Sequence, residues 1–119
     1  PDDFVLGTGE QHSVREFMEL AYEVAFPGHH LTWVSTGIDE KGYDSKTGNL
    51  LVAVDKRYFR PAEVETLLGD PSKAKEKLGW EPKIKLAELV EDMMSSDLKL
   101  MQKDKYLEDG GYQALNYFE

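Results

Sequence analysis

Apolar side chains recur at helical spacing through residues 14–25, where they form one stripe along an otherwise polar segment. The members of the stripe are Val14, Phe17, Met18, Ala21, Val24 and Ala25. This spacing predicts an amphipathic helix with its apolar face toward a core. Ser13 precedes the stripe and Glu16 stands three residues later, which is the capping-box pattern of a helix start. Pro27 and Gly28 predict the end of this helix.

A longer stripe of the same kind spans residues 86–103 and predicts the longest helix of the chain. It consists of Leu86, Leu89, Val90, Met93, Met94, Leu98 and Met101. Methionine side chains adapt readily to different partners, so this face could also bind another protein. Packing against the core of the same domain is the more common use of such a stripe, and we expect it here.

Short apolar runs predict extended segments or strands at residues 4–6, 31–34 and 50–54. The first run is followed by a Gly-Thr-Gly turn sequence. The last run is apolar throughout, which predicts burial on both faces or pairing under cover. Residues 35–49 are rich in Gly, Asp, Ser, Thr and Lys, so we expect a loop there. Within that loop, Thr47-Gly48-Asn49 is the candidate for a hairpin turn.

Proline residues predict the starts of two short helices between these strands and the long helix. Pro61 suits the first position of a helix that ends near Leu68, because its missing N–H is not needed there. Asp70 and Pro71 predict the N-cap and first position of the next helix, and Gly79 predicts its end. Together the elements predict a small α/β domain of α+β type, mainly helical, with two to four short strands beside the helices.

The chain has 119 residues, with 14 Lys or Arg and 23 Asp or Glu, so its formal charge is 14 − 23 = −9. This acidic balance does not favour binding to nucleic acid or to an anionic membrane. No apolar run reaches the roughly 20 residues of a membrane span. The absence of cysteine excludes disulfides and thiolate chemistry and fits a cytoplasmic protein. The chain opens with Pro1 rather than Met, which leads us to expect a piece of a longer protein.

The run from Tyr58 to Val64 carries the most informative chemistry. It places Arg60 at the mouth of the expected helix and Glu63 in its first turn, on the same face. Free N–H groups at a helix N-terminus favour an anion. Arg60 could hold a phosphate through two hydrogen bonds, and Glu63 could accept hydrogen bonds from sugar hydroxyls. The pair predicts half of a nucleotide-sugar site, although an ordinary surface ion pair would have the same spacing. Lys56 and Arg57 could add local positive charge.

Other candidate chemistry is weaker. Gly7 and Gly9 match the first two glycines of a dinucleotide fingerprint, but the third is replaced by His12, so we expect a plain turn. His29 and His30 are adjacent, with no carboxylate at a metal-ligand spacing, so we assign no metal site and expect solvated side chains. No tyrosine has a lysine four positions later. The Tyr/Lys couple of nicotinamide-dependent sugar enzymes is therefore absent, and we assign no catalytic residue.

Several segments together resemble the carboxyl-terminal part of the GDP-mannose 4,6-dehydratases, a family of extended short-chain dehydrogenases/reductases. The similarity runs from residue 1 to about residue 103. Residues 52–65 are the most distinctive segment, and the Leu-Leu-Gly-Asp-Pro-Ser-Lys-Ala run at residues 67–74 continues it. Residues 1–9 and 13–17 resemble the beginning of the same region. The Lys-Leu-Gly-Trp turn at residues 77–80 is shared more widely among extended members.

The resemblance implies a division of labour between two domains. An amino-terminal Rossmann domain, which this chain lacks, would bind NADP and carry the catalytic residues. Residues 1–103 would form the nucleotide-sugar-binding domain, with Arg60 on the diphosphate of GDP-mannose and Glu63 on the ribose hydroxyls. The family reaction oxidises the sugar at C4, eliminates water across C5 and C6 and returns the hydride to C6. GDP-mannose thereby becomes GDP-4-keto-6-deoxymannose, the precursor of GDP-fucose and related sugars.

The resemblance also implies that the complete enzyme is a cytoplasmic homo-oligomer. The 119 residues would bind no cofactor and would have no activity alone, because orienting a substrate helps only where the reacting groups are present. Residues 104–119 would form a carboxyl-terminal tail that either docks through its aromatic side chains or frays. These aromatics are Tyr106, Tyr112, Tyr117 and Phe118.

Two alternative functions stay open at this point. The chain could belong to another nucleotide-sugar epimerase or reductase of the same superfamily, which a sequence upstream would decide. It could also be a non-catalytic interaction domain that binds a protein through its methionine and aromatic faces. In that case, replacing Arg60 would leave the function intact and GDP-mannose would not bind.

Overall fold

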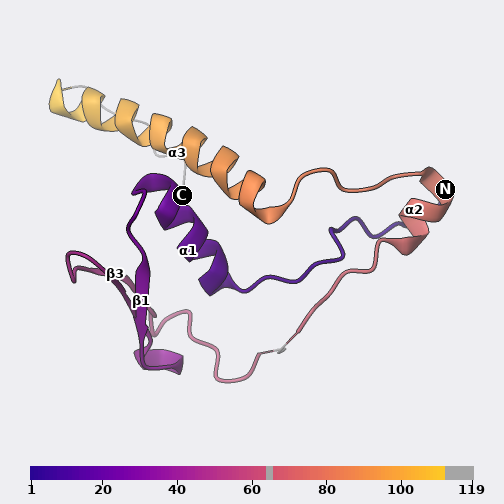
Figure 1. Cartoon of the computed structure of the whole chain (residues 1–119), viewed down its shortest axis with the longest axis horizontal. Coiled ribbons are helices and arrows are strands. Elements are labelled where there is room, and N and C mark those ends of the chain that lie inside the picture. The colour runs from indigo at the N-terminus through magenta and orange to yellow at the C-terminus, as the bar shows by residue number, and fades with distance from the viewer. Residues whose placement is uncertain (64–65, 112–119) are drawn as a thin grey trace.

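A computed structural model describes residues 1–63 and 66–111 of the chain. Its regular elements are α1 (Val14–Ala25), β1 (Leu31–Val34), the 3-10 turn η1 (Gly37–Asp39), β2 (Lys41–Asp44), β3 (Leu50–Ala53), α2 (Ser72–Leu78) and α3 (Leu86–Asp109). In Figure 1, α1 lies between α3 and the sheet, whereas α2 stands apart near the amino terminus, at the end of two extended connections. The described residues therefore confirm a small, mainly helical α/β structure with a few short strands.

The start of α1 agrees with the capping prediction. Ser13 Oγ accepts a hydrogen bond from the backbone N–H of Glu16 at 3.0 Å. The Glu16 carboxylate does not complete a capping box but lies 3.1 Å from His12 Nδ1. At the other end, the N–H of Phe26 donates to Tyr22 O at 2.8 Å, and Gly28 takes a positive φ of 84°. The predicted stop at the Pro-Gly pair is confirmed.

The sheet is antiparallel in the order β1-β2-β3. The expectation of a loop over residues 35–49 is wrong at its centre, because β2 is the middle strand and pairs on both edges. The sequence of β2 has little strand propensity, so its conformation depends on the neighbouring strands. Gly42 suits this close approach, since an added Cβ would lie 3.0 Å from the Trp33 ring, which would have to shift. The hairpin turn at Thr47-Gly48-Asn49 is confirmed, with Gly48 at a φ of 72°.

The expected burial of β3 is wrong. Leu50 and Leu51 expose 53% and 44% of their surfaces. An apolar run predicts burial only if another layer covers the strand, and no described element covers these two side chains fully. Apolar side chains of this edge strand thus remain available for contact.

Two predicted elements are missing from the described residues. Residues 4–6 form no strand, because no neighbouring strand pairs with them; Val5 and Leu6 are 53% and 63% exposed. Residues 61–63 and 66–69 form no helix, while residues 64–65 lie outside the description. A short helix needs an apolar face packed against a core. Leu67, which would supply that face, is 80% exposed.

The two later helices form as expected. The predicted N-cap of α2 is wrong by one residue: Pro71 takes the cap position without a side-chain cap, and Asp70 before it accepts a hydrogen bond from the N–H of Ser72 at 3.0 Å. Gly79 ends the helix at a φ of 65°, as predicted. α3 starts as predicted at Leu86 but continues beyond residue 103 to Asp109. The helix thus crosses the position where we divided the chain into a binding domain and a tail. That division concerns function and stays a prediction.

The apolar stripe of α3 is only partly covered. Val90 is completely buried against the rest of the structure, and Met94 and Leu98 are half-buried. Leu89, Met93 and Met101 each remain more than 40% exposed. The packing role that we expected for this stripe therefore holds for one side of it.

The chain exposes far more surface than a compact protein of its size. Its accessible surface is 9842 Å², whereas a compact monomer of this mass exposes about 6,500 Å². Its radius of gyration is 18.5 Å, against roughly 13.5 Å for a compact domain of this length. Among the described residues, the buried hydrophobic core consists of Ala74 and Val90, with Gly42 and Pro71 also buried. Large apolar areas of the chain are thus exposed and available for contact with other surfaces.

Candidate functional site

Arg60 and Glu63 lie together on the surface, in the irregular connection between β3 and α2. Arg60 Nη1 is 3.4 Å from Glu63 Oε1. The two side chains are 76% and 59% exposed. The sequence predicted that both side chains lie on the same face at the start of a helix. The structure brings them together without a helix in the described residues, so a helix dipole does not contribute to anion binding there.

The neighbouring cation Arg57 is also paired with a carboxylate. Its Nη2 donates to Asp55 Oδ2 at 2.7 Å and its Nε donates to Asp55 Oδ1 at 3.2 Å. The side-chain hydrogen bonds from Arg57 lower the pKa of the Asp55 carboxyl, and the same contact raises the pKa of the Arg57 guanidinium. Two of the three local cations, Arg57 and Arg60, are therefore paired with carboxylates in the free chain, and an anion must compete with these carboxylates.

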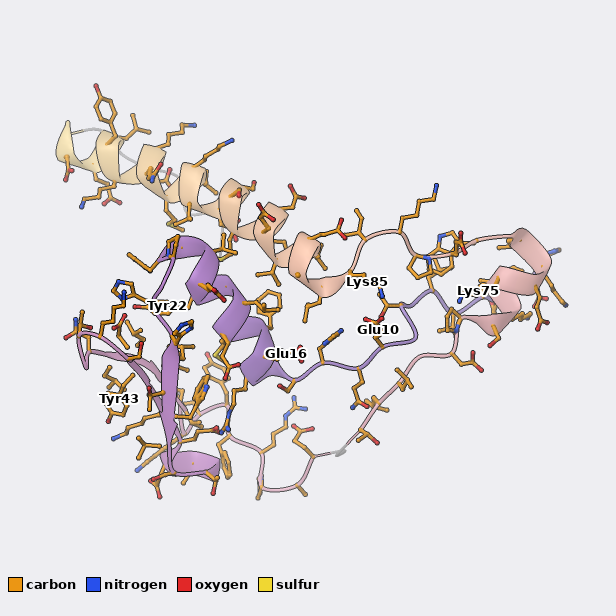
Figure 2. The ribbon with its side chains drawn as sticks, in the orientation of Figure 1. Glu10, Glu16, Tyr22, Tyr43, Lys75 and Lys85 are labelled. Carbon is orange, nitrogen blue, oxygen red and sulfur yellow. The ribbon has the colours of Figure 1, made fainter. Side chains whose placement is uncertain are left out.

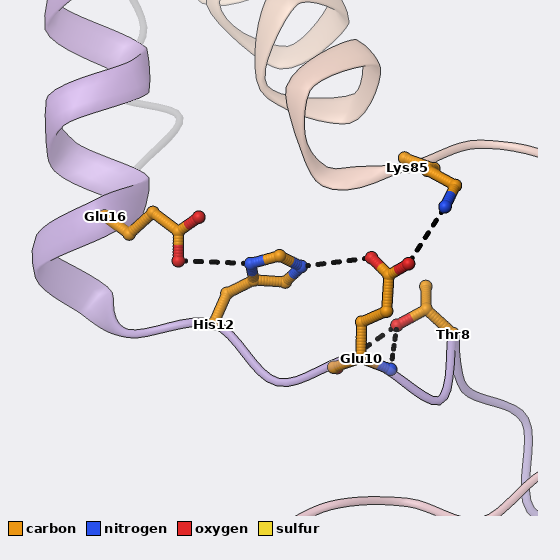
Figure 3. A network of polar contacts seen from close by, with 5 residues as sticks. All are labelled: Thr8, Glu10, His12, Glu16 and Lys85. Atoms are coloured by element: carbon orange, nitrogen blue, oxygen red, sulfur yellow. Dashed lines mark hydrogen bonds and ion pairs between the residues drawn. The ribbon is translucent and has the colours of Figure 1, made fainter.

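A chain of polar contacts joins the segment before α1 to the start of α3 (Figure 3). His12 lies between two acids, with Nδ1 3.1 Å from Glu16 Oε2 and Nε2 3.5 Å from Glu10 Oε2. Glu10 Oε1 accepts a hydrogen bond from Lys85 Nζ at 2.9 Å. The hydrogen bond from Lys85 lowers the pKa of Glu10, and Glu10 raises the pKa of Lys85. This contact connects residues 75 positions apart.

The Gly-Thr-Gly segment does not form a dinucleotide site. The Thr8 hydroxyl accepts the N–H of Glu10 at 3.1 Å, and Gly9 has a φ of 75°, so the segment is the plain turn that we expected. A fingerprint requires a strand before the turn and a helix N-terminus against the phosphates. Residues 4–6 supply no strand, and a Cβ built on Gly9 would meet nothing within 4 Å. Residues 7–9 therefore lack the geometry that holds the pyrophosphate of a dinucleotide.

Asp44 is the centre of a buried polar cluster that sequence reasoning missed. The carboxylate is 3% exposed and accepts hydrogen bonds from Tyr22 Oη, His29 Nδ1 at 2.8 Å and two backbone N–H groups. The backbone donors are Lys46 at 2.7 Å and Thr47 at 2.8 Å. The expectation of a solvated His29 is wrong, because its ring is partly covered and bonded to Asp44.

The chemistry of this cluster is that of a structural anchor. The hydrogen bond from Tyr22 is the largest cause of the lowered pKa of Asp44, and Asp44 raises the pKa of Tyr22 to about 12. A phenol that ionises this late is a poor base near neutral pH. The Asp44 oxygens are already occupied by donors. We therefore assign the Asp44 cluster (Tyr22, His29 and Asp44) to fixing the β2–β3 hairpin on α1. Figure 2 labels Tyr22 on the side of α1 that faces the hairpin.

The described residues include no group of three or more His, Asp or Glu side chains arranged to hold a metal ion. In residues 1–63 and 66–111, no helix has the length and apolar character needed to cross a bilayer.

Comparison with known proteins identifies the class of protein to which this chain belongs. The model of the family described as GDP-mannose 4,6 dehydratase matches residues 1–93, which include Arg60 and Glu63. The chain is 53% identical over 104 residues to "GDP-mannose 4,6 dehydratase 2" of Caenorhabditis elegans and 47% identical over 124 residues to "GDP-mannose 4,6-dehydratase" of Vibrio cholerae. A relative from Cricetulus griseus with the same enzyme name is 44% identical over 102 residues.

These alignments cover 87%, 96% and 86% of the chain but only 26%, 33% and 27% of the relatives. The chain thus spans between a quarter and a third of their length, and it matches their carboxyl-terminal part. It belongs to the GDP-mannose 4,6-dehydratase family.

Proposed function

We propose that this chain is the substrate-binding part of an enzyme that converts GDP-mannose to GDP-4-keto-6-deoxymannose. Family membership supports the reaction class, and the observation that carries the site is the exposed Arg60–Glu63 pair inside the matched residues. Arg60 holds the diphosphate, and Glu63 accepts hydrogen bonds from the ribose hydroxyls. A cation and an acceptor side by side suit a ligand that carries phosphate next to sugar.

Ligand binding requires the ion pair to open, and the energies favour this exchange. An exposed ion pair contributes about 0–1 kcal/mol, because water screens both charges. A hydrogen bond to a charged group contributes about 1.5–3 kcal/mol where a site excludes water. Arg60 therefore gains by leaving Glu63 for a diphosphate, and the released carboxylate becomes free to meet the ribose.

The cofactor and the catalytic residues lie outside these 119 residues. NADP supplies hydride transfer when bound, and a Rossmann domain preceding this chain holds it. The chain's own part is to bind and orient the nucleotide end, so the 119 residues alone have no dehydratase activity. The complete enzyme is a cytoplasmic homo-oligomer in this proposal.

The exposed apolar side chains around α2 fit the docking of that preceding domain. They include Val5 and Leu6 of the amino-terminal segment, Leu78 of α2 and Ile84 of the connection to α3, which are 53–63% exposed. Lys73 Nζ holds the amino-terminal segment on α2 by hydrogen bonds to Asp2 Oδ1 at 2.8 Å and Asp3 O at 2.9 Å. The segment that would continue into a preceding domain therefore starts beside this apolar surface.

The decisive experiment is a titration of the complete enzyme with GDP-mannose. We expect Arg60→Ala to weaken binding by roughly 1.5–3 kcal/mol, about 10- to 150-fold, because a charged hydrogen bond to the diphosphate is lost. Lys103→Ala is the control, since Lys103 is an exposed cation on α3, outside the connection that carries Arg60. The control should change the dissociation constant less than about 3-fold. If both variants changed the dissociation constant equally, or if neither changed it, the assignment of Arg60 to the site would be wrong.

A second measurement tests the division of labour. The 119-residue chain is incubated with GDP-mannose and NADP, and formation of the 4-keto product is followed. We expect no product. Turnover by these residues alone would contradict the proposal that the catalytic residues lie elsewhere. It would not affect the assignment of Arg60, which the titration tests separately.

A further inference from the structure

A capped turn precedes Arg60 in the connection between β3 and α2. The Asp55 carboxylate accepts a hydrogen bond from the backbone N–H of Arg57 at 2.9 Å, which is the bond of an Asx turn. The carbonyl oxygen of Asp55 accepts the N–H of Tyr58 at 3.0 Å, and this bond closes a β-turn over residues 55–58. Asp55 therefore holds the backbone of the turn through both its side chain and its main chain.

The side chains that follow Asp55 reinforce the same turn. The Arg57 guanidinium donates to both Asp55 carboxylate oxygens, with Nη2 2.7 Å from Oδ2 and Nε 3.2 Å from Oδ1. The guanidinium carbon also lies 5.4 Å from the centre of the Tyr58 ring, a distance at which a cation and an aromatic ring attract each other. These contacts make residues 55–58 one local unit, the Asp55 turn, which ends two residues before Arg60.

Packing does little to fix the connection that carries Arg60. Every residue from 55 to 63 is exposed. In Figure 1 the connection from β3 to α2 loops out on the side away from α3. Local constraints therefore set the path of the chain there. The Asp55 turn constrains the chain before Arg60, and Pro61 after it narrows the backbone conformations open to Arg60.

Local order of this kind affects how tightly an exposed side chain binds a ligand. A residue that moves freely must be ordered when the ligand binds, and that ordering weakens the affinity. A backbone that is held in place before binding avoids part of this cost. The Asp55 carboxylate supplies such a restraint without engaging the Arg60 guanidinium, whose own contact is with Glu63 at 3.4 Å.

We propose that Asp55 is a positioning residue for Arg60, because its carboxylate holds the turn from which Arg60 is presented to the nucleotide sugar. The inference rests on the proposed function, since it concerns the binding of the same diphosphate. The main alternative role for Asp55 has the opposite sign. If Asp55 only neutralised Arg57, its removal would release a cation near Arg60 and would tighten the binding of an anion.

Titration of the complete enzyme with GDP-mannose separates the two roles. We expect Asp55→Ala to raise the dissociation constant about 3- to 10-fold, the effect of losing ordinary hydrogen bonds. Asp55→Asn should stay within about 2-fold of the wild type, because an asparagine side-chain oxygen accepts the Arg57 N–H as an aspartate does. The control Asp97→Ala removes an exposed aspartate from α3 and should change the constant less than about 2-fold.

A double-mutant cycle tests whether Asp55 acts through Arg60. In the Arg60→Ala background, Asp55→Ala should change the dissociation constant less than about 2-fold, because the side chain that it positions is absent. The melting temperature of Asp55→Ala should stay within about 3 °C of its parent in either background. That result would separate positioning from a general loss of folding.

The outcomes also separate this inference from the site assignment on which it rests. An equal loss of affinity in both backgrounds, or an equal loss for Asp55→Ala and Asp55→Asn, would overturn the positioning role. Unchanged or tighter binding by Asp55→Ala would overturn it as well, while a weakened Arg60→Ala would leave the diphosphate assignment intact. If Arg60→Ala itself left binding unchanged, the proposed function would fail, and the positioning role would fail with it.

Discussion

The Asp44 cluster and the Arg60 loop (residues 54–63) both hold paired polar groups, but they differ in access to water. Asp44 is 3% exposed and accepts hydrogen bonds from two side chains and two backbone groups. Arg60 is 76% exposed and has one long ion pair with Glu63. A buried and fully bonded carboxylate stabilises a fold, whereas an exposed pair is easily exchanged for a ligand. The difference separates the part of the chain that holds its shape from the part for which we propose ligand binding.

The largest expected effect is on the buried side of this comparison. Asp44→Ala leaves the donors of Tyr22, Lys46 and Thr47 without their partner, so we expect the melting temperature of the 119-residue chain to fall by about 5–15 °C. Hydrogen exchange at the amides of Lys46 and Thr47 should accelerate about 10-fold or more. Asp55→Ala removes an exposed carboxylate and is the control. A melting temperature within 2–3 °C (roughly) of the wild type would show that the cluster is not an anchor.

Removing one donor should cost less than removing the acceptor. Tyr22→Phe deletes a single hydroxyl and leaves Asp44 bonded to His29 and to two backbone groups. We expect a decrease in melting temperature of about 4–8 °C, measured by circular dichroism. A decrease as large as that of Asp44→Ala would mean that the tyrosine alone holds the hairpin.

The acid dependence of stability should also come from Asp44. Its pKa is lowered in the folded state, so between the folded and the unfolded pKa the unfolded chain binds more protons. The stabilisation is present above about pH 4, the unfolded value, and is lost as the pH falls through the folded value. Asp44→Asn should remove this part of the dependence in melting curves recorded between pH 6 and 2.

At alkaline pH, the stability of the fold should instead decrease as the pH rises. The pKa of Tyr22 is raised to about 12 in the folded state, so its contribution is complete below about pH 10 and is lost as the pH approaches 12. Melting curves of the wild type should decline over this range more steeply than those of Tyr22→Phe. Parallel curves would show that the tyrosine hydroxyl is not held by Asp44.

The smallest effect is expected on the exposed side. Arg60→Ala should change the melting temperature by less than about 3 °C, because an exposed ion pair contributes little to stability. The same variant should weaken binding of GDP-mannose, as proposed above. A large loss of stability would erase the contrast between the two regions and would make any binding defect indirect.

Local patterns in the sequence were sufficient to predict the elements that are stabilised by nearby residues. Ser13 caps α1 and Gly79 ends α2, because these signals act within one helical turn. The spacing of Arg60 and Glu63 was enough to place them together, and they form an ion pair even without the predicted helix. The resemblance to the dehydratase family is likewise carried by the residues themselves and is confirmed by the family comparison.

Tertiary structure decided whatever depends on partners distant in the chain. β2 forms because strands on both sides supply hydrogen bonds. Residues 4–6 form no strand because no other strand lies beside them. Asp44 meets Tyr22 and His29 across 22 and 15 positions, a separation that no local periodicity reports. Capping and turn energies are local and can be read along the chain, whereas burial and strand pairing depend on which surfaces the fold brings together.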